Sequence, residues 1–145
     1  MPALTVNDVQ EFLRDHSENN ILLDQIENPE SLIEKAIQFT VELWNSTPPA
    51  TNDSSVRIPR PVLLYGVTAW LLRSSSLLQA RNQATVRDGM LSPIGIDDKA
   101  QLYLSMAGNF QAQFDAMTQS IKINRNCSGA FGQFGSGFSA PFKSK

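Results

Sequence analysis

At 145 residues the chain is long enough for one domain with a modest core, and no stretch approaches the roughly 20 apolar residues that span a bilayer. Its one cysteine, Cys127, cannot form a disulfide within a single chain. The net charge of −2, without a dense cluster of basic residues, argues against sequence-specific binding of nucleic acid.

The N-terminal part is predicted to form two helices. Thr5, with Asp8 three residues later, is typical of a cap that starts a helix, and the apolar spacing that follows predicts a helix to about residue 15. Asn28-Pro29-Glu30 predicts the start of a second helix, with Asn28 as its cap and the proline in its first turn. This helix is predicted to run to about residue 45, with an inward stripe of Ile33, Ala36, Ile37, Thr40, Val41 and Trp44.

Residues 46–60 are predicted to be a loop, because they are rich in proline, serine, threonine, asparagine and aspartate. The pair Pro48-Pro49 ends the preceding helix, since proline lacks the N–H group that continues the hydrogen-bond ladder. The loop is longer than most connections in a compact domain. Two interpretations stay open: a flexible link between two helical pairs, or a segment that contacts a partner.

The segment that organises the chain is a predicted hairpin of two long helices, over residues 61–85 and 97–123. Pro61 suits a first helical turn, and the run from Val62 to Leu72 is apolar nearly all round, which predicts burial on several sides. Asp97 and Asp98 predict the cap of the second helix. Its inward stripe is predicted to contain Tyr103, Ala107, Phe110, Phe114, Met117 and Ile121, widened near the start by Leu102, Met106 and Gly108. Its wetter face is predicted to contain Gln111, Gln113, Asp115, Gln119 and Lys122.

The hairpin connection and the last part of the chain differ from the helices in composition. Residues 86–96, called the tip here, contain Asp88-Gly89, a strong signal for a tight turn of the β-hairpin type. Residues 127–145, called the arm, are rich in glycine and serine, which predicts that no stable helix forms. The arm is either a disordered tail or a docking arm. Its four phenylalanines favour a docking arm, because such a segment cannot bury them locally.

Together these patterns predict an all-α protein. A four-helix bundle-like domain over residues 1–126 contains the long helical hairpin and a small β-hairpin-like tip, and an extended C-terminal arm follows it. Residues 1–55 contain ten acidic and two basic residues, a net charge of −8, and residues 56–145 contain four acidic and ten basic residues, a net charge of +6. This asymmetry reflects either solvated helix faces alone or opposite electrical ends that suit head-to-tail contact between copies.

No group of residues has catalytic spacing, so the sequence predicts no enzyme and no metal or cofactor site. His16 is the only histidine and lies far along the sequence from Cys127, so nothing local supports a Cys–His nucleophile pair, and an exposed loop histidine is favoured. Asp97 and Asp98 can in principle bind a hard cation, but a helix cap is favoured. The glycines of GAFGQFGSG neither follow a predicted strand nor open a helix, as a phosphate-binding loop requires.

Basic residues on the hairpin allow a further interpretation. Arg73, Arg81 and Arg87 lie on or beside its first helix, and Lys122 and Arg125 lie near the end of its second. Such side chains can approach a phosphate backbone. Lining a passage that nucleic acid crosses needs no tight grip and is compatible with the net charge. A helical nucleic-acid-binding accessory protein is therefore the alternative from a different functional class.

Three segments carry a resemblance to a known family: LLQARNQ closes the first long helix, TVRDGMLSPIGIDDKAQLYL covers the tip and the start of the second helix, and IKINRN lies near the end of that helix. With the acidic two-helix N-terminal part and the proline-rich connection, they resemble tailed-bacteriophage head-to-tail connector proteins, the adaptors beneath the portal. The resemblance covers most of the chain. It implies an α-helical subunit of a ring, typically a dodecamer, in the neck of the virion between portal and tail, made in the cytoplasm of the bacterial host.

The same resemblance implies roles for particular residues. The arm would dock on the portal protein and extend the channel for DNA, through Phe131, Phe134, Phe138, Phe142 and Lys143. The tip would contact a neighbouring subunit or a tail-side neck or tail terminator protein, through Arg87, Asp88, Gly89, Met90 and Leu91. Charges of the DNA channel or of the contacts between subunits would be Arg73, Arg81, Lys122 and Arg125, with transient non-specific contact to passing DNA. No membrane partner is expected, and the alternative within the same class is another phage tail or baseplate structural protein.

Overall fold

The computed structural model describes residues 3–16, 18, 26–87 and 98–135, with residues 82–87, 98 and 128–135 described by their backbone alone. Over these ranges the chain forms four α-helices: α1 (Val6–Leu13), α2 (Glu30–Ser46), α3 (Arg60–Arg87) and α4 (Asp98–Gly135). No strand occurs within the described ranges, so the all-α prediction is confirmed there. The predicted tip begins in the last two residues of α3, and its remaining residues lie outside the described ones.

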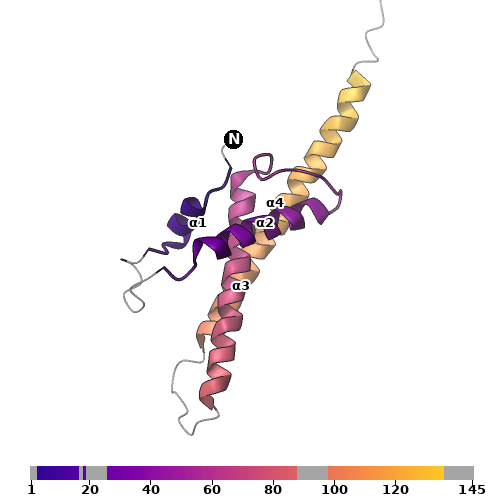
Figure 1. Ribbon diagram of the computed structural model, residues 1–145. Coiled ribbons are helices and arrows are strands. Elements are labelled where there is room, and N and C mark those ends of the chain that lie inside the picture. The colour runs from indigo at the N-terminus through magenta and orange to yellow at the C-terminus, as the bar shows by residue number, and fades with distance from the viewer. Residues whose placement is uncertain (1–2, 17, 19–25, 88–97, 136–145) are drawn as a thin grey trace, which may run out of the picture.

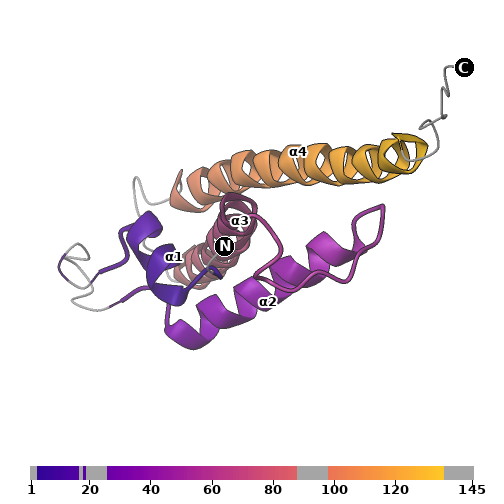
Figure 2. The same ribbon diagram turned by 90° about the horizontal axis from the view of Figure 1, so that it is seen from above.

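The helix α3 lies at the centre of the fold. The helix α4 packs along one side of it, and α1 and α2 pack on the other side (Figures 1 and 2). The helix α2 crosses α3 instead of running beside it (Figure 1). With 38 residues, α4 has a length of about 57 Å and extends well past the other helices (Figure 1).

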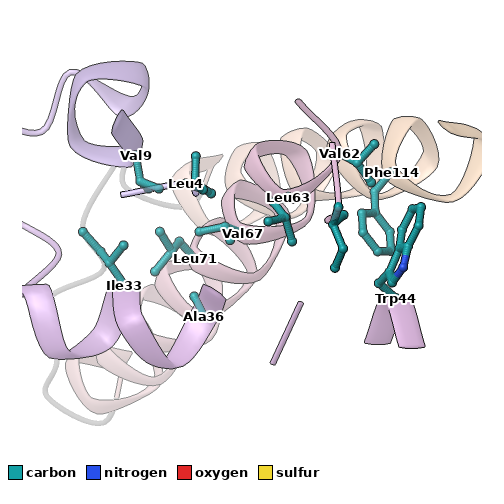
Figure 3. Packing of buried hydrophobic residues seen from close by; sticks show 11 residues of the cluster. Leu4, Val9, Ile33, Ala36, Trp44, Val62, Leu63, Val67, Leu71 and Phe114 are labelled. Atoms are coloured by element: carbon teal, nitrogen blue, oxygen red, sulfur yellow. The ribbon is translucent and has the colours of Figure 1, made fainter. Parts of the chain in front are cut away.

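The core forms where α2 and α3 cross and where α4 packs against them. Figure 3 shows Val62, Leu63, Val67 and Leu71 of α3 between the side chains of α2 and Phe114 of α4. All five are essentially inaccessible to solvent, so burial of the first half of α3 on several sides is confirmed. The inward stripe of α2 is also confirmed, with Ile33, Ala36, Thr40 and Trp44 buried and Ile37 and Val41 partly buried.

A glycine of α3 lies at the closest approach of the three long helices. A Cβ atom on Gly66 would clash with Cγ2 of Thr40 on α2 and would lie 2.9 Å from Cδ2 of Phe114 on α4. Carbon atoms pack at about 3.5–4.0 Å, so neither neighbour leaves room for a methyl group. The hydrogen side chain of Gly66 therefore sets how closely α2 and α4 approach α3.

Two expectations for α4 are wrong. The stripe is not widened by Leu102, Met106 and Gly108, all of which are exposed, because only its narrower part faces α3. The helix also does not end near Ile123 but continues to Gly135, so the extended arm predicted from residue 127 is helical over residues 127–135. The glycines of this stretch lower the helix propensity by about 1 kcal/mol each, and here they do not break a helix that is already nucleated by packing.

The predicted cap of α1 is confirmed. The Thr5 backbone N–H donates to the Asp8 carboxylate at 2.8 Å, and the Asp8 N–H donates back to the Thr5 hydroxyl at 3.3 Å. Asp8 also forms an ion pair with Arg60 at the start of α3. The hydrogen bonds from the Thr5 side chain and backbone hold the pKa of Asp8 below its ordinary value against a small opposing effect of burial, and the Arg60 charge adds to this.

Replacing Asp8 by asparagine is expected to lower the free energy of unfolding by about 1 kcal/mol at pH 7. A carboxylate whose pKa is lowered by folding stabilises the protein at pH values above its unfolded-state pKa. This stabilisation is lost as the pH falls through its folded-state pKa. The difference between wild type and Asp8→Asn should therefore shrink below about pH 4. Urea unfolding at pH 7 and pH 3 measures this difference in the free energy of unfolding. The control is Glu34→Gln, at an exposed position of α2. A difference that does not change with pH would contradict the role of the Asp8 carboxylate.

The start of α2 differs from the prediction. The helix begins at Glu30, its capping position is Pro29, and no side chain caps it. Asn28 instead bonds to Asp15, which follows α1: its backbone N–H and its Nδ2 donate to Oδ2 of Asp15 at 2.7 and 2.9 Å. The N–H of Glu27 donates to the other carboxylate oxygen at 2.8 Å. Asp15 is buried, so these bonds fasten the end of α1 to the start of α2.

Candidate assembly surfaces

A lysine from α4 closes the C-terminal end of α2. Lys122 is only 1 % exposed, so its predicted place on the wetter face of α4 is wrong. Its Nζ donates hydrogen bonds to the carbonyl oxygens of Trp44, of Thr47 at 2.6 Å and of Pro49 at 3.1 Å. Three acceptors match the three N–H groups of an ammonium ion, and a cation suits the negative end of the α2 dipole.

The same cluster contains a second cation and a carboxylate. Nη1 of Arg125 lies 2.8 Å from Oδ2 of Asp53, and Nη2 donates to the carbonyl oxygen of Arg57 at 3.0 Å. Nε1 of Trp44 also donates to Asp53 at 3.0 Å. Both cations lie over the Trp44 ring, with Nζ of Lys122 5.1 Å and Cζ of Arg125 5.6 Å from its centroid.

The pKa values follow from these contacts. Burial lowers the pKa of Lys122 below the ordinary lysine value; the charge of Asp53 opposes this and Arg125 adds to it. For Asp53, burial acts to raise the pKa, but the hydrogen bond from Trp44 and the charge of Arg125 outweigh it and hold the pKa below its ordinary value. The cluster therefore pairs Asp53 with two cations, of which Lys122 is buried and Arg125 is exposed.

These bonds fasten the predicted loop to two helices. The side chain of Asn45 on α2 bonds to both the N–H and the carbonyl of Asp53, at 2.8 and 3.0 Å, and the Thr51 N–H donates to the Asn45 carbonyl at 3.0 Å. Lys122 and Arg125 hold the same loop from α4. Residues 47–57 thus have contacts along most of their length. A flexible link between two helical pairs would not have these contacts.

Exposed apolar side chains gather near the end of the hairpin that leads to the tip. Ser76 of α3 donates to the carbonyl oxygen of Ala100 at 2.8 Å, which places these two parts of the helices at the same level. Around that level four leucines are 46–69 % exposed, Leu77 and Leu78 on α3 and Leu102 and Leu104 on α4. These four leucines leave apolar surface open to solvent on both helices at this level of the hairpin.

A pocket of about 350 Å³ opens beside this part of the hairpin, between α1, α3, α4 and the connection from α1 to α2. Phe12 and Met106 are 42 % and 40 % exposed, so the pocket opens at the surface. The Phe12 ring meets the Phe110 ring edge-on at 6.0 Å. The pocket is lined by Phe12, Leu13, Asp15, Glu27, Asn28, Thr68, Leu71, Leu72, Ser75, Tyr103, Met106 and Phe110.

The lining of this pocket also contains polar groups, which come from the connection after α1, from α3 and from α4. Burial raises the pKa of Glu27, the charge of Asp15 raises it further, and Lys99 opposes both. Burial also raises the pKa of Tyr103, and the charge of Glu27 adds to this. The Oγ1 atom of Thr68 is fully buried and has no hydrogen-bond partner. An apolar pocket with a few polar groups is typical of a site that receives a ligand or a side chain.

The residues predicted as functional are distributed as follows. Arg73 and Arg81 are exposed on α3, whereas Lys122 and Arg125 meet at the Trp44 cluster. Phe131 and Phe134 lie in the last part of α4, and Arg87 ends α3, all three described by backbone alone. Outside the described residues lie Phe138, Phe142 and Lys143 of the arm and Asp88, Gly89, Met90 and Leu91 of the tip.

Sequence reasoning did not find the Trp44 cluster or the pocket. Asp53 and Lys122 are separated by many residues, and no spacing rule brings a loop aspartate to a lysine on a distant helix. Phe110 was predicted on an apolar face, and only the packing of α1 near α4 brings the ring of Phe12 to it. The one available signal was the two tryptophans, because a buried tryptophan N–H requires an acceptor.

No protein-family model, no curated protein and no solved structure matches this chain. Within the described ranges, no helix is long and apolar enough to cross a membrane. Over the same part of the chain, no three potential metal ligands of the His, Cys, Asp or Glu type lie together. His16 is exposed just after α1, and Cys127 is exposed on α4 beyond Lys122.

Proposed function

We propose that this protein is a structural subunit of a tailed-phage neck, which assembles into a ring adaptor between portal and tail. The observation that carries the proposal is the group of exposed leucines on both helices of the hairpin, near the end that leads to the tip. A monomer with these leucines in water exposes apolar surface that a neighbouring subunit in a ring would cover. A structural role, and not an enzymatic one, accounts for this surface.

The length of α4 supports the same proposal. Its last part extends well past α2 and α3 (Figure 1), and a single small domain gains little from such an extension. In a ring, parallel copies of an extended helix give a wall around a channel. Arg73 and Arg81, exposed on α3, are the channel or inter-subunit charges under this proposal. Lys122 is excluded from that role, because its ammonium is buried within the subunit.

Electron microscopy of the purified protein over a concentration series tests the ring. Closed rings with a central hole are expected, and Leu77→Glu with Leu102→Glu should prevent them, since two charges would then lie in the contact. The matched control is the chain carrying Gln113→Glu and Gln119→Glu, two exposed polar positions of α4. Monomers alone, both with and without portal protein, would reject the proposal.

Deleting residues 136–145 tests the arm. These residues follow α4 and contain Phe138, Phe142 and Lys143, so the truncated chain should keep its helical circular dichroism and its melting temperature. We expect it to lose co-sedimentation with portal protein. A truncated protein that still binds the portal with unchanged affinity would show that residues 136–145 are not the docking element.

Contact with passing DNA is a secondary part of the proposal. Any binding should be weak and should fall steeply as salt rises, because it depends on phosphate contacts alone. The nucleic-acid-binding alternative predicts instead a tight interaction that Arg73→Ala and Arg81→Ala abolish. Electrophoretic mobility shift at 50 and 200 mM salt separates the two.

A further inference from the structure

The size and lining of the pocket between α1, α3 and α4 restrict what it can bind. Its walls are apolar, with Leu71 and Leu72 of α3 facing Met106 and Phe110 of α4. Its volume of about 350 Å³ is at the lower end of the roughly 300–1,000 Å³ typical of ligand pockets. This size suits one aromatic side chain and its neighbours better than an extended ligand.

One side of the pocket is negative. Asp15 is 4 % exposed, and its carboxylate accepts hydrogen bonds from the N–H groups of Glu27 and Asn28. The carboxylate of Glu27 lies close enough to Asp15 for the two charges to raise the pKa of Glu27 beyond the effect of burial. Lys99 already offsets part of this repulsion, and a segment that brings a second cation to Glu27 would offset more of it.

The chain contains a segment with this chemistry. In the stretch SGFSAPFKSK, residues 136–145, Phe142 is followed directly by Lys143. An aromatic ring next to an ammonium group matches an apolar pocket with carboxylates at one side. The uneven charge along the chain agrees with this pairing, because the acidic residues of the pocket belong to the negative N-terminal part and the lysine to the positive part.

The chain is too short after α4 for Phe142 to reach the pocket of its own subunit. Phe110 lines the pocket, and α4 continues from it to Gly135, a distance of about 37 Å at 1.5 Å per residue. Seven further residues lead from Gly135 to Phe142, and fully extended they span at most about 25 Å. Since α4 runs on nearly straight away from α1 (Figure 2), Phe142 cannot return to the pocket of its own chain.

We propose that this pocket receives Phe142 of a second copy of the chain, with Lys143 beside the carboxylate of Glu27. Each subunit then offers an arm at one end and a pocket at the other, which makes the contact head-to-tail. The inference rests on the self-assembly part of the proposed function; it assigns Phe142 and Lys143 to the neighbouring subunit and leaves Phe131, Phe134 and Phe138 to the portal.

Sedimentation velocity of full-length variants tests the contact. Phe142→Ala is expected to weaken self-association about 30-fold or more, as for a buried aromatic anchor, and Met106→Trp should do the same by filling the pocket. Glu27→Lys and Lys143→Glu should each weaken it about 10-fold, and the double variant should restore it to near the wild-type value. Glu27 and Met106 are exposed, so their variants should keep the wild-type melting temperature. No recovery in the double variant would overturn the pairing.

A mixing experiment tests the direction of the contact. Met106→Trp subunits keep their arm and lose their pocket, and Phe142→Ala subunits keep their pocket and lose their arm. Each should be monomeric alone, and an equimolar mixture should form one-to-one dimers that do not grow further. Monomers in the mixture, or wild-type association by both variants alone, would overturn the inference. Rings that persist in both variants would overturn it while leaving the proposed connector function intact. If the mixture forms dimers but the wild-type protein forms no ring, with or without portal protein, the contact between Phe142 and the pocket is supported and the proposed connector function is rejected.

Discussion

Replacing Lys122 by methionine is expected to lower the free energy of unfolding by about 3 kcal/mol. Methionine keeps the length of the side chain but donates no hydrogen bond, so the carbonyl oxygens of Trp44, Thr47 and Pro49 lose a shared donor. The negative end of the α2 dipole also loses its cation. Asp53 would keep Arg125 as a partner, which limits the loss to the ammonium itself.

Equilibrium urea unfolding measures the effect, and Lys35→Met provides the matched control. Lys35 is exposed on α2, so the same substitution there should change stability by no more than about 0.5 kcal/mol. Equal stabilities of the two variants would show that water satisfies the three carbonyls as well as the ammonium does. Tryptophan fluorescence gives a second readout, because both Lys122 and Arg125 lie over the Trp44 ring.

Replacing Gly66 by alanine is expected to lower the free energy of unfolding by about 2 kcal/mol, although alanine is the better helix former. The new methyl group would clash with Thr40 and would lie 2.9 Å from Cδ2 of Phe114. Thr40 cannot turn away easily, because its hydroxyl donates to the Ala36 carbonyl at 2.7 Å and its side chain is fully buried. Phe114 is likewise fully buried.

The same substitution at Gly108 should have the opposite sign. A Cβ atom there would have nothing within 4 Å, so Gly108→Ala should stabilise α4 by up to about 1 kcal/mol through propensity alone. In a Gly66→Ala background, Thr40→Ser should recover part of the loss, since it removes the clashing methyl group and keeps the hydroxyl. Destabilisation at both glycines would mean that helix packing at Gly66 is not the cause; thermal and urea unfolding of the three variants and the wild type decide it.

Local signals in the sequence were sufficient for most of the helices. The Thr5–Asp8 pair predicted the cap of α1, and the three-to-four spacing from Ile33 to Trp44 predicted the buried face of α2. Such features depend on residues within one or two turns, so they can be judged without the fold. The end of α4 was misjudged by the same reasoning, because glycine content was weighed without the long packed helix that precedes it.

The charged residues of the candidate surfaces could not be predicted in this way. Lys122 has the spacing of a solvent-facing residue, and it is buried because the C-terminal end of α2 presents carbonyl groups at that point of α4. Asp15 and Glu27 belong to a connection without periodicity, and their position beside α3 and α4 depends on how α1 packs. Contacts of this kind join residues far apart in the sequence, for which helix spacing carries no information.

By itself the sequence determined that this protein is helical, where three of the four described helices begin, which face of α2 is apolar and that the first half of α3 is buried on several sides, since these follow from caps, prolines and the 3.6-residue period. Only the tertiary structure decided that α2 crosses α3 at Gly66, that Lys122 closes α2, and that α1, α3 and α4 leave a pocket between them. The physical reason is that crossing and packing are set by the shapes of side chains from different helices meeting at one place.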